Sequence, residues 1–160
     1  MAVDMFLEIK GVTGESKDKT HAGKIDILSF SLGVSQSASF HMGGGGGGGK
    51  CNVQDMTCTK PVDKSSPEIF LRCCTGKHFE EATLIIRKAG DTPLEYETYT
   101  MTKVIISSVS KGASSASDGL TEQISMNFAK LKYVYKEQSA TGGVESEPEM
   151  TFDIAENAAA

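Results

Sequence analysis

The sequence predicts a mainly β fold, either an antiparallel β-barrel or two packed sheets, with one α-helix flanking it. Apolar and polar residues alternate, or the chain reads as extended, at 5–10, 25–34, 53–59, 78–88, 95–109, 120–135 and 150–154. Connections rich in glycine, serine and charge separate most of these runs, and one segment near residue 70 has the signals of a short helix. Runs with a period of two that are joined by such turns are typical of antiparallel sheets.

The first two strands are expected at 5–10 and 25–34. One face of the second strand is apolar and is expected to lie in the core: Leu28, Phe30, Leu32 and Val34. The other face is small and mildly polar: Ile27, Ser29, Ser31 and Ser35. Because alternate residues of a strand point to opposite faces, the second set predicts a wall turned toward something other than bulk water.

A long connection follows at 36–52, with seven consecutive glycines from Gly43 to Gly49. Glycine cannot pack and loses the most backbone entropy on ordering, so an exposed, mobile arm is predicted. The pattern Gly44-x4-Gly49-Lys50 matches most of a phosphate-binding loop. A strand is nevertheless expected after it, and Cys51 stands where serine or threonine is needed, so no nucleotide site is predicted.

The one predicted helix begins at Ser65-Ser66, whose hydroxyls suit an N-cap, and has Pro67 in its first turn. Gly76 is a natural stop at its C-terminus. Its apolar residues are expected to pack on a sheet: Ile69, Phe70, Leu71, Cys73 and Cys74.

The long strand at 120–135 changes its apolar phase, because Phe128 and Leu131 have opposite parity. Such a slip predicts a bulge or sharp bend near Ala129-Lys130, as at the corner of a barrel. A polar linker at 141–148 leads to the last strand. We expect a single domain over residues 1–157, with 158–160 frayed.

Composition narrows the classes of function. The 160 residues suffice for one domain with its own core. A formal charge of -5 argues against a nucleic-acid partner and against an anionic membrane surface. No run is long and apolar enough for membrane insertion, and no signal peptide is recognised at the N-terminus. The four cysteines lack zinc-ligand spacing and are expected to be reduced.

No active site is recognised, and neither an enzyme activity nor a cofactor or metal is expected. His21, His41 and His78 lie in or beside predicted loops without a second ligand at metal spacing, and are expected to be solvated. Glu80 and Glu81 are adjacent on a strand, so they point to opposite faces and cannot act as a carboxylate pair.

Several segments, in order, resemble one known family. They are Gly14-Glu15-Ser16-Lys17-Asp18 with His21, 25–31, 60–67, 76–78, 87–90, 104–110 and 127–130. Together they resemble the haemolysin-coregulated protein (Hcp) family, the tube subunit of the bacterial type VI secretion system. The resemblance runs from the N-terminus to about Tyr135 and implies a fold similar to phage tail-tube proteins.

The resemblance also implies a function. Six subunits form a ring with a wide channel, and the rings stack into a tube that carries small effectors. The other partners implied are a trimeric spike protein at the tip and a contractile sheath. The subunit is expected in the cytoplasm before firing and outside the cell afterwards, exported by this machine without a signal peptide.

The resemblance also suggests which residues take part. Ser31, Ser29 and Ile27 are expected to line the channel and to contact effectors. The 36–52 arm is expected to contact the next ring through Phe40, His41, Lys50 and Cys51. Two alternatives stay open: a monomeric β-sandwich that binds a ligand without assembly, and an enzyme with an unfamiliar site.

Overall fold

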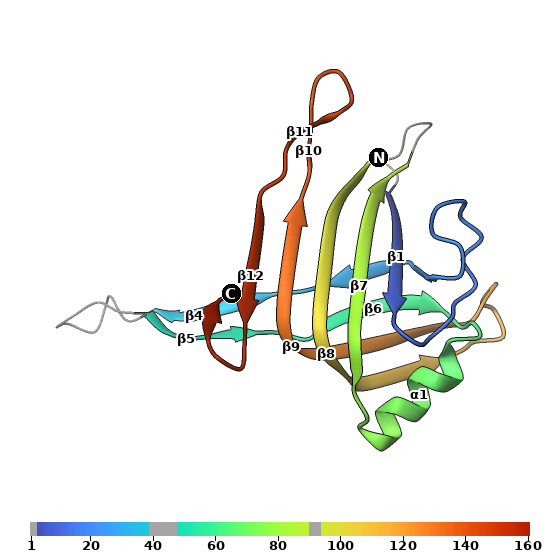
Figure 1. The fold of residues 1–160 in the computed structure, drawn as a ribbon. Coiled ribbons are helices and arrows are strands. Elements are labelled where there is room, and N and C mark those ends of the chain that lie inside the picture. The colour runs from blue at the N-terminus through green and yellow to red at the C-terminus, as the bar shows by residue number, and fades with distance from the viewer. Residues whose placement is uncertain (1–2, 39–47, 90–93) are drawn as a thin grey trace.

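The fold is a strongly bent antiparallel sheet with one helix beside it (Figure 1). The computed structural model describes residues 3–38, 48–89 and 94–160. The elements are β1 (Val3–Ile9), β2 (Ile25–Ile27), β3 (Ser29–Ser31), β4 (Val34–Ala38), β5 (Gly48–Val53), β6 (Met56–Pro61), α1 (Ser66–Thr75), β7 (Phe79–Lys88), β8 (Glu95–Gly112), β9 (Thr121–Tyr135), β10 (Glu137–Gln138), β11 (Val144–Ser146), β12 (Glu149–Asp153) and β13 (Ala158–Ala159). The predicted mainly β fold with one flanking helix is confirmed.

The strand pairings of the main sheet nearly form a closed ring. It can be followed from β9 through β8, β7 and β1 to β2, and from β3 through β6 back to β9. Only Leu28 separates β2 from β3 along the chain. Two small ribbons, β4 with β5 and β10 with β11, stand apart from the main sheet. In Figure 1 the β4–β5 ribbon extends to one side of the molecule and α1 lies at the other.

The bend predicted near Ala129-Lys130 is present. Thr102 pairs with Lys130 and Val104 with Phe128, which leaves Lys103 and Ala129 between two pairs. Lys103 adopts a left-handed φ of 55°, as at a bulge. The long strands β8 and β9 therefore turn together, and each contributes one half to each layer (Figure 1).

The core between the layers is mostly aliphatic, with methionine and no tryptophan. Its fully buried members include Leu7, Leu84, Met101, Ile124 and Met126. Each faces inward because alternate residues of a strand point to opposite faces of the sheet, and one of these faces lines the core.

The segment 25–31 departs from the predicted phase. Ile27 is buried, with 6% of its surface exposed, whereas Leu28 is 54% exposed and Val34 68% exposed. The cause is a change of partner at Leu28: β2 pairs with β1, and the Leu28 N–H then donates to the Thr59 carbonyl as the chain joins β6. The prediction that Leu28 and Val34 lie in the core is wrong, while Phe30 and Leu32 pack against the core.

Helix α1 ends as predicted, with Gly76 in the left-handed region at φ 69° and its N–H bonded to the Arg72 carbonyl. Its start differs, since Ser65 makes no side-chain cap and its hydroxyl donates to Asp63. Only part of the predicted apolar stripe of the helix faces the core. Ile69 is fully buried, whereas Phe70 is 48% exposed.

A buried ionic cluster joins the start of α1 to the sheet. The Lys60 ammonium lies 2.5 Å from Glu122 Oε1 and 3.2 Å from Asp63 Oδ1, and donates to the Ser66 hydroxyl at 3.1 Å. Ser66 donates to Glu122 at 2.6 Å, and Lys111 lies 2.7 Å from its other oxygen. Burial tends to raise the pKa of Glu122, but the bonds from Lys111, Lys60 and Ser66 bring it below the usual value.

His21 is buried, which corrects the expectation of a solvated loop histidine. Only 4% of its surface is exposed; its ring stacks on Phe6, and its Nε2 lies 2.6 Å from a Glu95 carboxylate oxygen. Lys24 donates to its Nδ1 at 2.9 Å, so Nε2 is the nitrogen that donates to Glu95. His78 is exposed, as expected.

The ends of the predicted arm are ordered into strands, which corrects part of the loop predicted at 36–52. Residues 34–38 and 48–53 form the β4–β5 ribbon. At the C-terminus, where a frayed end is expected, Ala158 and Ala159 pair with β12. Within the described ranges, no helix has the length and apolar character needed to cross a membrane.

Candidate functional site

One outward face of the bent sheet is built almost entirely from small polar side chains. Register brings them into two rows across four strands, β3, β6, the first half of β9 and the last part of β8. One row contains Ser31, Thr57, Ser125 and Ser108, and the other contains Ser29, Thr59, Gln123 and Ser110. We call these eight residues the polar wall.

The polar wall is uncharged and only loosely tied together. Thr57 Oγ1 and Ser125 Oγ lie 3.1 Å apart, within hydrogen-bond distance. The residues between wall positions point to the opposite face, where Phe30, Cys58 and Ile124 pack in or against the core. Burial raises the pKa of the Cys58 thiol to about 12, so this side chain is an inert core residue. One sheet therefore has an apolar inner face and a wall of hydroxyls.

A small charged bridge borders the polar wall. The Asp55 carboxylate accepts bonds from Ser107 Oγ at 2.6 Å and Asn127 Nδ2 at 2.9 Å. Ser107 lies at a register shift between Ile106 and Ser108, which aims its hydroxyl toward Asp55. The bridge ties the β5–β6 connection to β8 and β9 without placing a charge inside the two rows.

The structure separates the predicted channel-lining residues. Ser29 and Ser31 lie on the polar wall and are exposed. Ile27 does not share that face, because the change of partner at Leu28 turns it into the core. Of the predicted stacking residues, exposed Lys50 and half-buried Cys51 lie in β5, and Phe40 and His41 fall outside the described residues.

Sequence reasoning missed six of the eight wall residues. Thr57 and Thr59 carry a usable signal, since they alternate with Met56, Cys58 and Lys60. Alternation alone, however, does not say which strands lie side by side. The wall depends on pairing between β6 and β9, which are about sixty residues apart in the chain.

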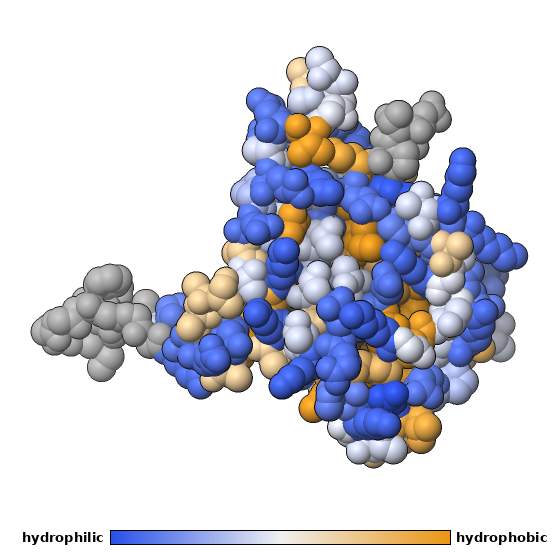
Figure 2. Space-filling model, in the orientation of Figure 1, coloured by the Kyte–Doolittle hydropathy of each residue, from blue (hydrophilic) through white to orange (hydrophobic). Residues whose placement is uncertain are grey.

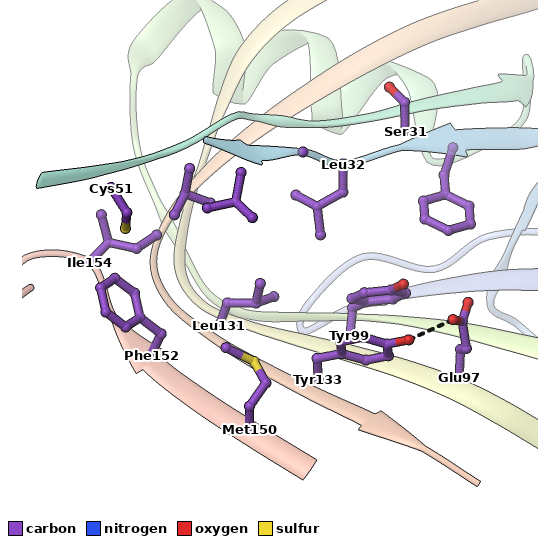
Figure 3. Close-up of a pocket in the computed structure, with 14 residues that line it drawn as sticks. Ser31, Leu32, Cys51, Glu97, Tyr99, Leu131, Tyr133, Met150, Phe152 and Ile154 are labelled. Atoms are coloured by element: carbon purple, nitrogen blue, oxygen red, sulfur yellow. Dashed lines mark hydrogen bonds between the residues drawn. The ribbon is translucent and has the colours of Figure 1, made fainter. Parts of the chain in front are cut away.

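An apolar cavity of about 780 Å³ opens on the other side of β3 (Figure 3). Its lining comes from β3 and the segment after it, from strands β4, β5, β8, β9 and β12, and from the residue after β12. The lining includes Leu32, Val34, Cys51, Tyr99, Leu131, Tyr133, Met150, Phe152 and Ile154. In Figure 3 the Leu32 side chain points into this space, whereas the Ser31 hydroxyl points away from it. We call this space the apolar cavity.

Two stacked tyrosines form one side of the apolar cavity. The rings of Tyr99 and Tyr133 are 4.6 Å apart and nearly parallel, and the Tyr133 hydroxyl donates to Glu97 Oε1 at 2.7 Å. This bond to a carboxylate, with burial, raises the pKa of Tyr133 well above its usual range. Both tyrosines therefore stay neutral at physiological pH and serve as fixed apolar surface with one polar end.

The polar wall and the apolar cavity contain no arrangement for bond chemistry. In the described ranges, no three His, Cys, Asp or Glu side chains come together as metal ligands. A wall of hydroxyls and one amide can make weak, exchangeable hydrogen bonds, whereas the apolar cavity can accept apolar side chains.

Comparisons with known proteins identify relatives of the chain. A family model described as "Type VI secretion system effector, Hcp" matches residues 6–135. The chain is 50% identical over 149 residues to protein hcp1 of Pseudomonas aeruginosa, and the match covers 92% of each protein. It matches the crystal structure of Hcp1 from Salmonella typhimurium with a TM-score of 0.83, 33% identity and full coverage of both chains. A structure titled as that of a type six secretion system protein has a TM-score of 0.93 at 24% identity, covers 99% of this chain and all of its own, and shows the shared fold.

Proposed function

Because the chain belongs to the Hcp family of type VI secretion proteins, which are secreted structural proteins and not enzymes, we propose that it is a tube subunit. Six copies would associate side by side into a ring, and rings would stack into a tube. The polar wall would face the channel. The observation that carries this proposal is an uncharged sheet face bounded by two strand edges without a strand partner in the described residues.

The two edges support association of identical subunits. On one side of the wall, β3 pairs with β6 alone. On the other side, pairing between β7 and β8 ends at Val104, so Ile105 to Gly112 pair only with β9. Exposed strand edges carry unpaired N–H and C=O groups that favour addition of another strand. Two different edges on one subunit would make a head-to-tail contact, which closes into a ring when the rotation allows it.

The chemistry of the polar wall suits transient cargo. Its hydroxyls can donate and accept hydrogen bonds, and its two rows carry no charge that would select one sign of protein surface. The tube would hold small effectors by many weak contacts and release them in the target cell. We further propose that the tube is tipped by a spike protein, driven by a contractile sheath and assembled in the cytoplasm before secretion.

The first test is the mass of the particle. Light scattering behind size exclusion, with negative-stain images of the peak, should give about six subunits and annular particles with an open centre. A monomer that stays monomeric when concentrated would refute the tube subunit and would favour a ligand-binding module that uses the apolar cavity.

The second test addresses the wall. Ser31→Gln places a longer side chain on the exposed face, so rings should persist while co-purified effector falls. Ser117→Gln, the same change in the loop between β8 and β9, is the matched control and should leave effector recovery unchanged. Equal recovery from both variants would count against a channel-facing Ser31.

A further inference from the structure

Helix α1 has a second apolar face that the described residues of the subunit cover only in part. Its inner face packs toward the core through Ile69 and Cys73. The opposite face, here called the outer helix face, consists of Pro67, Phe70, Leu71 and Cys74, all exposed. Their spacing places them on one stripe of a helix, as in helices that dock into grooves. In Figure 2 hydrophobic atoms reach the surface at lower right, where Figure 1 places α1.

The outer helix face is a firm projection. Phe70 and Leu71 are 48% and 54% exposed, and the Lys111 ammonium lies 5.8 Å from the centre of the Phe70 ring. The buried cluster around Glu122 fixes the start of the helix to the sheet, and Arg72 lies 4.3 Å over the Phe79 ring near its end. An apolar projection held at both ends loses little side-chain and backbone freedom on docking.

The apolar cavity has the size and lining to receive such a projection. Its volume of about 780 Å³ exceeds the space that one phenylalanine and one leucine side chain fill, and aromatic and aliphatic groups line most of it. Its rim is exposed at Val34 and Met150. The projection and the cavity are thus an apolar pair on a single subunit. In Figure 1, α1 lies at the lower right, whereas β12, which borders the cavity, lies on the left.

Their positions match the two strand edges proposed to meet in the ring. The apolar cavity is bounded by Phe30 to Val34, in and directly after the β3 edge. Helix α1 packs beside β8, whose last residues form the other edge. If the β3 edge of one copy met the β8 edge of the next, the cavity of the first and the helix of the second would lie at the same contact.

Charge favours the same pairing. Residues 149–156, which include β12 at the cavity, carry three acidic side chains, Glu149, Asp153 and Glu156, although Lys132 of β9 lies 3.8 Å from Glu149. Residues 62–78, which include α1, carry three basic and two acidic side chains, of which Arg72 and Glu68 pair with each other. Lys111, which pairs with Glu122, also lies beside Phe70. Opposite charges around an apolar contact steer association and set its orientation.

We propose that the outer helix face of one copy docks into the apolar cavity of its neighbour, with Phe70 and Leu71 as the anchors. The docking rests on the proposed ring and specifies the contact that closes it. Since the two surfaces differ, the contact is head-to-tail and repeats around the ring. The occupant of the cavity is therefore a second copy of this chain.

The absence of tryptophan from the chain offers a direct test. Phe70→Trp introduces a single tryptophan whose emission reports burial. In rings its emission should lie at shorter wavelength than in the dissociated protein at high dilution. Val144→Trp, placed on the exposed β11 strand away from α1 and the cavity, is the control and should show no such shift within single rings.

A charge exchange tests the partner of the helix. Leu71→Glu and Val34→Lys each place a charge in the contact at a residue that is exposed in the subunit, so the fold should persist by circular dichroism. Each should raise the concentration at which rings dissociate by about tenfold or more. Combining the two changes should recover most of that loss.

The outcomes separate the docking from the tube. The docking would be refuted if rings of about six subunits form, but the Phe70→Trp variant in them emits like an exposed tryptophan and both charge variants assemble normally. The proposal of a tube subunit would remain. Absence of rings in the unmodified protein would overturn both.

Discussion

Glu122→Gln should destabilise the protein more than any change to a surface charge. The substitution leaves the Lys60 ammonium, which is fully buried, without the carboxylate 2.5 Å away. Removing one partner of a buried ion pair costs about 3–5 kcal/mol. Because Asp63 remains 3.2 Å from Lys60, we expect the lower end, about 3 kcal/mol.

The measurement is urea unfolding followed by circular dichroism, at one fixed protein concentration because association adds to apparent stability. For a domain of this size the loss corresponds to a thermal midpoint lower by about 6–12 °C. A loss below about 1 kcal/mol, the range of exposed pairs, would refute the view that Glu122 holds a buried cation in place.

Two matched variants define the cause. Glu81→Gln removes a partly exposed carboxylate 3.8 Å from the exposed Lys10 ammonium and should cost less than about 1 kcal/mol. Lys60→Met combined with Glu122→Leu removes both fully buried charges and should recover part of the stability lost in Glu122→Gln, since the ions that lose a partner, Asp63 and Lys111, are less buried than Lys60.

Three further predictions follow from local geometry. Gly14→Ala should destabilise by about 1–3 kcal/mol in the same assay, because the new methyl group would lie 2.4 Å from the Lys24 carbonyl oxygen; unchanged stability would show that this loop yields freely. The hydrogen bond from Arg87 holds the pKa of Asp18 in the folded protein well below its usual range. The ionised Asp18 therefore stabilises the fold above the ordinary carboxyl pKa, and this stabilisation is lost as pH falls through the pKa of Asp18 in the folded protein. The thermal midpoint of Asp18→Asn should therefore fall less between about pH 4 and pH 2 than that of the unmodified protein, and parallel curves would contradict it. Cys58 should resist iodoacetamide at pH 8 until the protein unfolds, since burial raises its pKa to about 12; labelling in the folded protein, read by peptide mass spectrometry, would be inconsistent with its place in the core.

Features that depend on neighbouring residues could be predicted from the sequence. The strands follow from alternation, and the helix stop follows from Gly76, which adopts the left-handed conformation that glycine favours. The bend in β9 follows from the parity change between Phe128 and Leu131. Each signal lies within a few residues of the structure that it predicts, so distant parts of the chain could not override it.

Features set by distant contacts could not be predicted. His21 is buried because Phe6 stacks on it and Glu95 accepts a hydrogen bond from its Nε2, and those partners are 15 and 74 residues away. Phe70 and Leu71 belong to an apolar stripe in the sequence, but the core packs against Ile69 and Cys73 and leaves Phe70 and Leu71 about half exposed. The uncovered remainder of such a stripe is informative, because it marks the surface that the subunit leaves for another molecule.

The error at Ile27 shows how the candidate site depends on one backbone position. Alternation from residue 25 to 34 places Ile27, Ser29 and Ser31 on one face. The chain instead changes its partner from β1 to β6 at Leu28, which reverses the inward parity there. Of the residues predicted on that face, Ser29 and Ser31 share it and Ile27 does not. Because β3 is also an edge strand, the same kink that turns Ile27 into the core presents Ser29 and Ser31 on the polar wall. It also leaves one side of their strand without a strand partner among the described residues.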